Sequence, residues 1–467
     1  MKKKTIYILV ENQVRELNSI ILFSIISSMR GYRVYIGTHH SIFELLNEKK
    51  DFGGIFMNKG SCSIEDSNLI KKKCDKLVII DQEISPGYSD YYYNYIIGAR
   101  HYKNTLKYVD RYYCINDQVK KRAEKILLKE NKKLSIISVG WPRFDVMHSQ
   151  FSHIFDVNIK KLKKKYNKFI LFNSDFGLVS KKDINVFENT EIFSKPTKKF
   201  INMHYKIRNS FKDHAIVDFE KCKIFLLSVI KDIKNIKIVI RPHPAESISE
   251  WKNFCKKSKN FFLAEPIYDV VSAIYASTHV LHRGCTTGYQ SLLTKKKTGY
   301  LNLLKQNSKT NHFRPSLLSL SKNITNNYQF NMWFKEKNNF KLKDIGSLKK
   351  VLNSNQKLAC EKILDDLDSL VVTSVSRHKK FKLYSDSQVQ FHQVKNYLYD
   401  ILVKLGIKRQ RNFLSRYKTK KIQKSFNNSN IKKLVGLFLK SKFFKNKKGK
   451  TKVNEVSDVL FEIDEIN

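Results

Sequence analysis

The sequence predicts an α/β protein with two domains, each built on a parallel sheet, followed by a basic helical tail. Three observations lead to this fold class. Short β-rich runs alternate with helical stretches up to about residue 375, the length of 467 residues exceeds one ordinary domain, and residues 403–452 differ in composition from the rest. A hydrophobic content of 42%, with 31 Phe and 23 Tyr, is enough to form two packed cores.

The first predicted domain covers residues 1–150. An apolar stretch at 17–29 predicts a buried first helix and not a signal peptide, because charged residues precede it and no small-residue cleavage site follows. Strands that alternate with helices form a parallel sheet covered on both faces, so this domain is predicted to be Rossmann-like. Its predicted strands are the runs 5–10, 33–37, 54–57, 77–81, 111–115 and 135–140.

The second predicted domain covers residues 151–375 and begins with a lysine-rich helix at 158–167. A second alternating set of elements follows, which predicts another Rossmann-like sheet. Residues 176–218 are irregular and polar, and form either a loop that orders over a ligand or a small helical insertion. The predicted strands are the runs 168–173, 236–240, 261–264, 279–282 and 298–302.

Residues 376–467 form the predicted tail. Its segment 403–452 contains eighteen Lys or Arg residues and no Asp or Glu. At 431–440 apolar residues recur at helical spacing beside lysines, which indicates either an amphipathic helix on an anionic membrane surface or a solvated basic helix. The acidic residues between 455 and 465 could fold back on this basic segment.

The formal net charge of +46 comes from 88 Lys and Arg against 42 Asp and Glu. Either a composition bias explains it or the surface attracts anionic partners. No zinc finger, RNA-binding aromatic motif or basic recognition helix is recognisable before the tail, so no specific nucleic-acid partner is predicted. The seven cysteines are scattered, without CxxC pairs, and no apolar run approaches the ~20 residues that span a bilayer. We expect a cytoplasmic protein that contacts the inner membrane surface peripherally through its tail.

Two polar segments end predicted strands of the second domain. The segment 241–244 follows the strand at 236–240, and the segment 282–290 lies between the strand at 279–282 and a helix. Parallel α/β sheets bind ligands at the carboxyl ends of their strands, and a turn that opens a helix binds phosphate. We therefore predict an anion site for the phosphate of a nucleotide-activated donor. Its predicted residues are Arg241, His243, Pro244, Arg283, Gly284, Thr286, Thr287 and Gly288.

Simpler structural roles remain open at both segments. The prolines on both sides of His243 restrict the backbone, so this histidine either contacts the ligand or only occupies a strand end. Thr286, Thr287 and Gly288 either surround a phosphate or form an ordinary helix N-cap.

Loops that follow strands of the first domain carry carboxylates. A transferase needs a general base within hydrogen-bond reach of the acceptor hydroxyl, and we rank Glu83 first, then Asp81, then Glu11. Each carboxylate could instead cap a helix or pair with a lysine. Arg143, in the loop 140–145, either faces the donor phosphate or pairs with Asp145.

No catalytic metal or cofactor is predicted. Asp366-Leu367-Asp368 has the letters of a metal-binding Asp-x-Asp pair, but apolar residues recur through it at helical spacing. Leu367 is therefore expected to face the core, with the two carboxylates toward solvent. Glycine-rich phosphate loops of the P-loop and GxGxxG types are absent from the sequence.

Six short segments occur in a characteristic order, namely 11–16, 81–83, 140–145, 172–177, 241–244 and 282–288. Taken in this order, they resemble the bacterial surface carbohydrate biosynthesis proteins, which are similar to GT-B glycosyltransferases. The resemblance covers about residues 5–305. The His-Pro element followed by a Thr pair also resembles, more distantly, the CMP-binding motifs of bacterial sialyltransferases, capsule Kdo transferases and CDP-glycerol glycerophosphotransferases.

The resemblance implies two Rossmann-like domains that face a cleft, as in the GT-B fold. It places His243 on the donor phosphate, and Thr286 and Thr287 on the same phosphate or its ribose. It implies a cytidine nucleotide, with a CMP-activated acidic sugar favoured over a CDP-linked donor, and an inverting transfer to a glycan or lipid-linked acceptor in surface polysaccharide, capsule or lipopolysaccharide biosynthesis. A CDP-glycerol-type phosphotransferase and a UDP-sugar 2-epimerase-like enzyme are the alternatives.

Overall fold

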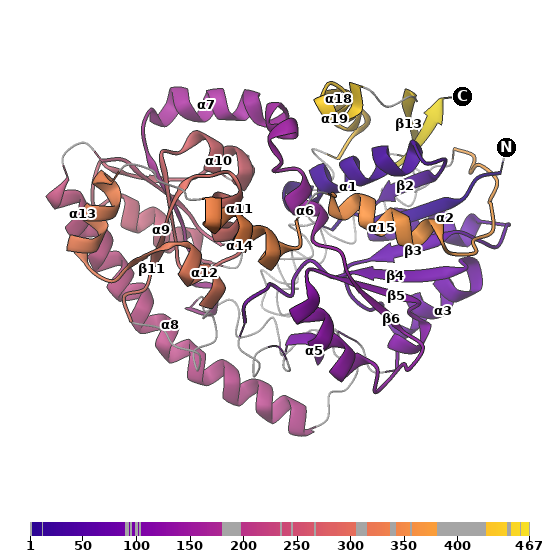
Figure 1. Cartoon of the computed structure of the whole chain (residues 1–467), viewed down its shortest axis with the longest axis horizontal. Helices are drawn as coiled ribbons and strands as arrows, with labels where there is room; N and C mark the ends of the chain where they lie inside the picture. The colour runs from indigo at the N-terminus through magenta and orange to yellow at the C-terminus, as the bar shows by residue number, and fades with distance from the viewer. Residues whose placement is uncertain are drawn as a thin grey trace, which may run out of the picture. The chain divides into compact units, whose positions relative to one another are not determined.

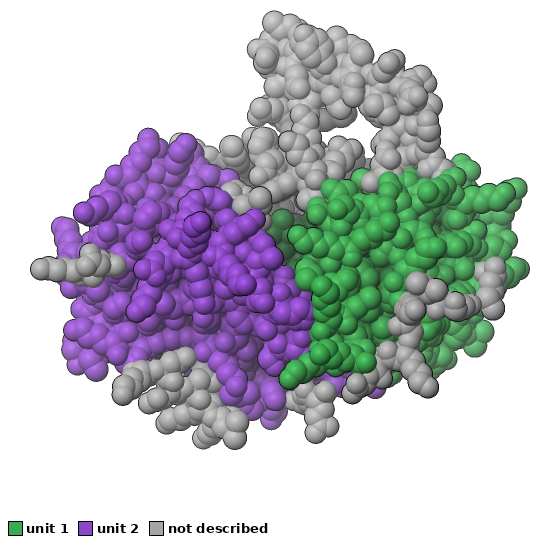
Figure 2. Space-filling model, turned by 90° about the horizontal axis from the view of Figure 1, so that it is seen from above, with its two compact units in different colours: residues 1–58, 65–79, 364–467 green, residues 59–64, 80–363 purple. Residues whose placement is uncertain are grey.

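A computed structural model describes most of the chain, and the described residues form two compact units (Figure 2). Unit 1 comprises Met1–Asn58, Glu65–Ile79 and Leu364–Asn467, and unit 2 comprises Lys59–Ile64 and Ile80–Ile363. The described residues from Leu364 onward thus group with those of 1–58 and 65–79, and the boundaries at 150 and 375 stay predictions. The described residues are 2–11, 13–88, 93, 96–98, 101, 104–179, 198–233, 236–243, 246–265, 268–304, 315–336, 342–354, 357–380, 426–445, 450–457 and 459–466.

The first sheet has eight strands in the order β13-β14-β2-β1-β3-β4-β5-β6. The pairs β1–β2, β1–β3, β3–β4 and β5–β6 are parallel, and all six strands lie where the sequence predicts them. This confirms the predicted α/β class for the first part of the chain. The strands are β1 (Thr5–Leu9), β2 (Arg33–Gly37), β3 (Ile55–Asn58), β4 (Lys76–Ile80), β5 (Arg111–Cys114) and β6 (Ser135–Ser138).

The helices around this sheet begin with α1 (Gln13–Ser28), whose residues from Ile21 to Ser28 are all buried, as predicted for the first helix. Thr38 is the N-cap of helix α2 (His39–Glu48), and its hydroxyl accepts a hydrogen bond from the backbone N–H of Ser41. Leu367 is fully buried, which confirms that it faces the core. The remaining helices are α2 (His39–Glu48), α3 (Ile64–Lys73), η1 (Leu106–Tyr108), α5 (Asp117–Leu127), α6 (Pro142–Asp145), η2 (Ser149–Phe155) and α15 (Ala359–Asp368).

The end of the chain contributes helices and two strands to unit 1. Helix α18 (Asn428–Leu439) confirms the helix predicted at 431–440, and α19 (Lys442–Lys445) follows it. The apolar residues Ile431, Val435 and Phe438 are buried, and α18 packs on α1 and β13. Part of the apolar face of this helix therefore lies inside unit 1, and a contact of the tail with an anionic membrane stays a prediction.

Strands β13 (Lys450–Ser457) and β14 (Leu460–Ile466) form an antiparallel hairpin that the sequence analysis did not predict. Strand β14 pairs with β2, also antiparallel, and so extends the sheet. The acidic residues do fold back on the basic segment, since Asp464 lies opposite Lys452 in the hairpin.

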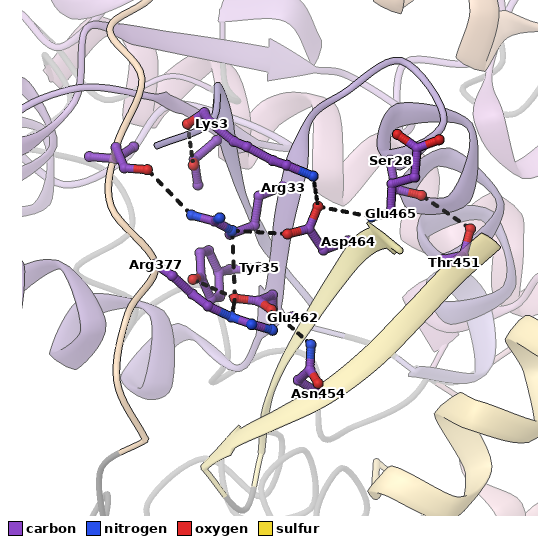
Figure 3. Close-up of polar contacts among 12 residues, drawn as sticks. Lys3, Ser28, Arg33, Tyr35, Arg377, Thr451, Asn454, Glu462, Asp464 and Glu465 are labelled. Carbon is purple, nitrogen blue, oxygen red and sulfur yellow. Dashed lines mark hydrogen bonds and ion pairs between the residues drawn. The ribbon is translucent and has the colours of Figure 1, made fainter. Parts of the chain in front are cut away.

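Buried charges join this hairpin to the first strands (Figure 3). Arg33 Nε lies 3.2 Å from Asp464 Oδ2 and 3.7 Å from Glu462 Oε2. Tyr35 Oη donates to Glu462 at 2.8 Å, and Lys3 Nζ donates to Asp464 at 2.8 Å. A buried charge is stable inside a protein only when it is paired. Because the partners of Arg33 come from the hairpin, the hairpin is an integral part of the sheet.

The second sheet has six strands in the order β12-β11-β10-β7-β8-β9, and every pair is parallel. The sequence predicted five of these strands and missed β12, which has only three residues. The result confirms a second Rossmann-like sheet. The strands are β7 (Ile170–Asn173), β8 (Ile238–Arg241), β9 (Phe261–Leu263), β10 (His279–His282), β11 (Lys297–Leu301) and β12 (Lys322–Ile324).

Helices cover both faces of the second sheet (Figure 1). Ile170 and Phe172 pack with residues of the long helix α8, whereas Leu171 packs with α7 and α10. Helix α7 confirms the predicted lysine-rich helix, and the described part of 176–218 is helical from residue 198 onward. The helices are α7 (Asp156–Tyr166), η3 (Gly177–Val179), α8 (Lys198–Asp232), α9 (Ile248–Cys255), α10 (Val270–Ala276), α11 (Thr287–Leu293), α12 (Pro315–Leu320), α13 (Asn327–Lys335) and α14 (Leu342–Leu352).

Among the described helices, none combines the length and apolarity needed to cross a bilayer.

Candidate functional site

A row of polar side chains crosses the second sheet at the carboxyl ends of its strands. Strand register places Arg241 of β8 beside Asn173 of β7, Asn173 beside His282 of β10, and His282 beside Tyr300 of β11. Residues in register on parallel strands point to the same face, and here it is the face that carries α7 and α10. The two predicted polar segments are therefore brought to one edge of the same sheet.

The loop after β8 holds His243 in a turn built around Glu246. The carboxylate of Glu246, only 8% exposed, accepts the backbone N–H of His243 at 3.0 Å and that of Phe176 at 2.8 Å. Ser174 Oγ donates to both of its oxygens at 2.9 and 2.8 Å, and Trp251 Nε1 donates at 2.5 Å. Glu246 thus joins the loop after β8 to the loop after β7. Pro244 lies outside the described residues.

Burial raises the pKa of Glu246 above its ordinary value, while the four groups that donate to it act in the opposite direction. Arg241 and His243, at the open end of this loop, are both half-buried. Glu246 is not among the residues predicted from the sequence. The available signal was an acidic residue three positions after His243, the spacing at which a side chain reaches back to the N–H at the start of a turn.

The turn after β10 is shaped by two glycines and a buried histidine. His282 Nδ1 accepts the N–H of Gly284 at 3.0 Å, so we assign the ring proton to Nε2, which lies 3.1 Å from Ser321 Oγ. Gly284 has a positive φ of 92°, which glycine adopts readily. A Cβ at Gly288 would lie 2.7 Å from His282 Cε1, so this glycine permits α11 to pack on the histidine.

Thr286 and Thr287 are half-buried at the start of α11, and Thr287 Oγ1 lies 2.6 Å from Cys285 Sγ. Thr286 occupies the N-cap position, and its side chain makes no capping hydrogen bond. The interpretation of this turn as an ordinary hydroxyl N-cap is therefore not supported at Thr286.

Arg283 occupies a buried position in which its guanidinium already has protein partners. Arg283 Nε forms an ion pair with Asp218 of α8, and Nη1 donates to the carbonyl of Asp175 at 3.0 Å. The guanidinium also lies 4.4 Å from the centre of the Phe176 ring. These contacts join the turn to α8, and the predicted nucleotide contact of Arg283 stays a prediction.

Asp81 organises the loop that follows β4. Its carboxylate accepts the hydroxyl of Tyr112 at 2.6 Å and the backbone N–H groups of Glu83 and Ile84 at 2.9 and 3.0 Å. Its backbone carbonyl accepts Trp141 Nε1 at 2.8 Å. Asp81 is buried whereas Glu83 is half-buried, so the carboxylate of Glu83 is the more accessible of the two candidate bases.

Arg143 lies beside this loop. Its backbone N–H donates to Gln82 Oε1 at 3.2 Å, and its guanidinium lies 3.9 Å from the centre of the Trp141 ring. Asp145 accepts the backbone N–H groups of Ala359 and Cys360 at 3.0 and 2.8 Å, so it caps α15. Burial raises the pKa of Asp145 to about 7.

The loop 81–88 is attached to the helix that begins with the two threonines. Tyr289 of α11 donates its hydroxyl to the carbonyl of Pro86 at 3.1 Å and lies 2.8 Å from Ser316 Oγ. Gly87 has a φ of 79°, and a Cβ there would collide with Ser316 Oγ. Within unit 2, the candidate base Glu83 and the candidate phosphate turn are therefore linked through one helix.

Two further sequence candidates lie in unit 1. Glu11 is exposed, and its backbone N–H donates to Glu16 Oε2 at 3.2 Å. Asp368 pairs with Arg30 and accepts the hydroxyl of Tyr32. Among the residues that the structure describes, no three His, Cys, Asp or Glu side chains are grouped so that they could hold a metal ion.

Comparisons with known proteins give structural matches only. No protein-family model matches the chain, and a search of curated proteins also finds no match. Among solved structures, the wall teichoic acid polymerase TagF is similar with a TM-score of 0.47 and 9% identity over 78% of this chain and 87% of that chain. MnaA from S. aureus, solved with UDP, has a TM-score of 0.46 and 13% identity over 78% and 96%. The UDP-GlcNAc 2-epimerase of Methanocaldococcus jannaschii has a TM-score of 0.43 and 14% identity over 78% and 99%.

Proposed function

We propose that this chain is a glycosyltransferase that transfers a sugar from a nucleotide donor to a glycan or lipid-linked acceptor in surface polysaccharide, capsule or lipopolysaccharide biosynthesis. The observation that supports this is the convergence of Arg241 and His243 with the turn at 284–288 at one edge of the second sheet. A cation, an imidazole and hydroxyl groups at the carboxyl ends of parallel strands suit the phosphate of a nucleotide.

In the proposed inverting reaction, Glu83 accepts the proton of the acceptor hydroxyl as its oxygen bonds to the anomeric carbon. The bond between that carbon and the phosphate oxygen breaks, and the phosphate leaves with the electron pair. Arg241 and His243 stabilise the negative charge that develops on this phosphate. We place the base at Glu83 because the carboxylate of Asp81 already accepts hydrogen bonds from the hydroxyl of Tyr112 on β5 and from two backbone N–H groups of the loop. The proposal uses no metal ion.

The donor in this proposal is a CMP-activated acidic sugar of the Kdo or sialic type. The support is the sequence of motifs alone, so a panel of nucleotides provides the first test. Thermal unfolding of the protein at moderate salt is measured with CMP, CDP, UMP, UDP and GDP. Stabilisation by cytidine nucleotides supports this donor, CDP alone indicates a CDP-glycerol-type phosphotransferase, and a uridine preference indicates a UDP-sugar enzyme.

His243→Ala tests the phosphate site. We expect this variant to fold, to lose nucleotide stabilisation, and to turn over about a hundredfold more slowly, since a donor to developing charge contributes about two orders of magnitude. His214→Ala is the matched control, because His214 is exposed on α8 of the same unit. Normal turnover in a folded His243→Ala protein would contradict the assignment.

The proposed membrane contact involves lysines of α18. Lys432, Lys433 and the C-cap residue Lys440 are exposed, whereas the apolar residues Ile431, Val435 and Phe438 of the helix are buried. Binding to an anionic membrane surface would therefore be electrostatic and would weaken with salt. Co-sedimentation with phosphatidylglycerol vesicles should be lost in the triple Lys→Glu variant and at high salt. Binding to neutral phosphatidylcholine vesicles would contradict this mode.

A further inference from the structure

Asn173 is an anomaly in the polar row of the second sheet. Its side chain is only 2% exposed, yet neither Oδ1 nor Nδ2 has a hydrogen-bond partner within the described protein. It ends the central strand β7, in register with Arg241 on one side and His282 on the other. His282, by contrast, has partners on both ring nitrogens.

An unpaired buried carboxamide opposes folding, because its donors and its acceptor lose water without replacement. The same face of β7 is otherwise apolar, since Phe169 and Leu171 precede Asn173 at alternate positions and belong to the packed core. A leucine of similar size would fit this pattern. Groups of this kind in a folded protein call for an explanation, and a binding role is one of the few that accounts for both unpaired atoms.

The chemistry of the two atoms restricts the ligand. A phosphate only accepts hydrogen bonds, so it would satisfy Nδ2 and leave Oδ1 unpaired, whereas a cation would satisfy only Oδ1. A hydroxyl group both donates and accepts. The neighbouring strand, about 4.8 Å away, carries Arg241, which the proposed function places on the phosphate.

We propose that Asn173 binds a hydroxyl group of the nucleotide ligand, adjacent to the phosphate held by Arg241 and His243. This inference rests on the proposed function. The hydroxyl belongs either to the ribose or to the transferred sugar, and the two sources are distinguished by the ligands used in the test.

The experiment compares Asn173→Leu and Asn173→Ala with wild type and with Asn302→Leu. Asn302 is a suitable control because it is a buried asparagine directly after β11 and has interaction partners. Without ligand, Asn173→Leu should unfold at a temperature a few degrees higher than wild type, because a penalty of burial is removed. Asn302→Leu should unfold at a lower temperature.

Binding is then measured with CMP and UMP and with their 2′-deoxy counterparts. If the ribose is the partner, wild type should prefer the ribonucleotide about tenfold, and both Asn173 variants should bind the two forms equally. If wild type does not discriminate, the comparison moves to CMP-Kdo, CMP-sialic acid and UDP-GlcNAc against the free nucleotides. A preference for the whole donor that is lost in the variants then assigns the hydroxyl to the transferred sugar.

Two results distinguish a failure of the proposed function from a failure of the role assigned to Asn173. If wild type binds none of these nucleotides, the proposed function fails, and the hydroxyl assignment fails with it. If wild type binds them and the Asn173 variants bind them equally well, the function stands and only the role of Asn173 is refuted. A lower unfolding temperature in Asn173→Leu, with unchanged binding, would show instead that an internal water satisfies the amide.

Discussion

Glu246→Gln perturbs the group that positions His243 while preserving its shape. The carboxylate accepts hydrogen bonds from four groups, namely Ser174 Oγ, Trp251 Nε1 and two backbone N–H groups. In glutamine an NH₂ group replaces one of the two oxygens. If the remaining oxygen accepts the backbone N–H groups of His243 and Phe176, the new NH₂ group faces the N–H of Trp251. One charge-assisted hydrogen bond of roughly 1.5–3 kcal/mol is then lost and a buried donor stays unpaired at about 1–3 kcal/mol.

The loss of a buried charge offsets part of this destabilisation, because burial alone disfavours the carboxylate and raises its pKa. We therefore expect the free energy of unfolding to fall by about 3 kcal/mol in Glu246→Gln. Urea unfolding followed by tryptophan fluorescence measures it, since Trp251 is one of the partners. Glu250→Gln, an exposed change on α9 of the same unit, should stay within ~0.5 kcal/mol of wild type.

The same variant tests positioning of the candidate site. If Glu246 holds the backbone of His243, the nucleotide affinity should fall in folded Glu246→Gln and should be unchanged in Glu250→Gln. Stability equal to wild type would refute the reasoning, because it would mean that losing the hydrogen bond from Trp251 and leaving a buried donor unpaired has no net cost. Reduced stability with normal nucleotide affinity would assign Glu246 a purely structural role.

Three further predictions concern other buried groups. Burial raises the pKa of Asp145 to about 7, so the folded protein retains a proton that the unfolded chain releases from about pH 4 upward. The stability of wild type relative to Asp145→Asn should therefore fall by about 1.4 kcal/mol per pH unit between those values, and a difference in urea unfolding that does not change with pH would contradict this. Gly288→Ala should lower the free energy of unfolding by roughly 1–3 kcal/mol, because its Cβ would lie 2.7 Å from His282 Cε1, although alanine is the better helix former. An unfolding temperature of this variant above that of wild type would refute the clash. Glu462→Gln should lower the free energy of unfolding, measured in urea, by about 3–5 kcal/mol, because it leaves the buried Arg33 with one carboxylate fewer. Glu465→Gln is the control, and an equally small effect of the two variants would contradict the prediction.

The strands of both sheets could be predicted because their signal is local. Each of the six strands in the first 150 residues, and five of the six in the second sheet, is a short β-rich run between helical stretches. The hairpin β13–β14 could not be predicted in this way. Its residues mix lysines, carboxylates and apolar side chains without a regular alternation over both strands. They form a strand pair at this place because β2 offers an open edge and Arg33 offers a partner to Asp464 and Glu462.

The sequence by itself determined the α/β class, the order of the strands along the chain and the two polar segments that follow β8 and β10, because periodicity and strand ends are written in neighbouring residues. Only the tertiary structure decided which of these residues have internal partners. Asp218 pairs with Arg283 across 65 positions, and Glu246 joins loops that are about 70 positions apart. In the sequence, Asn173 follows the apolar residues of a strand. Only the folded structure shows that its buried side chain has no hydrogen-bond partner among the described residues. Hydrogen bonds and ion pairs depend on distances in space, which residue order alone does not specify.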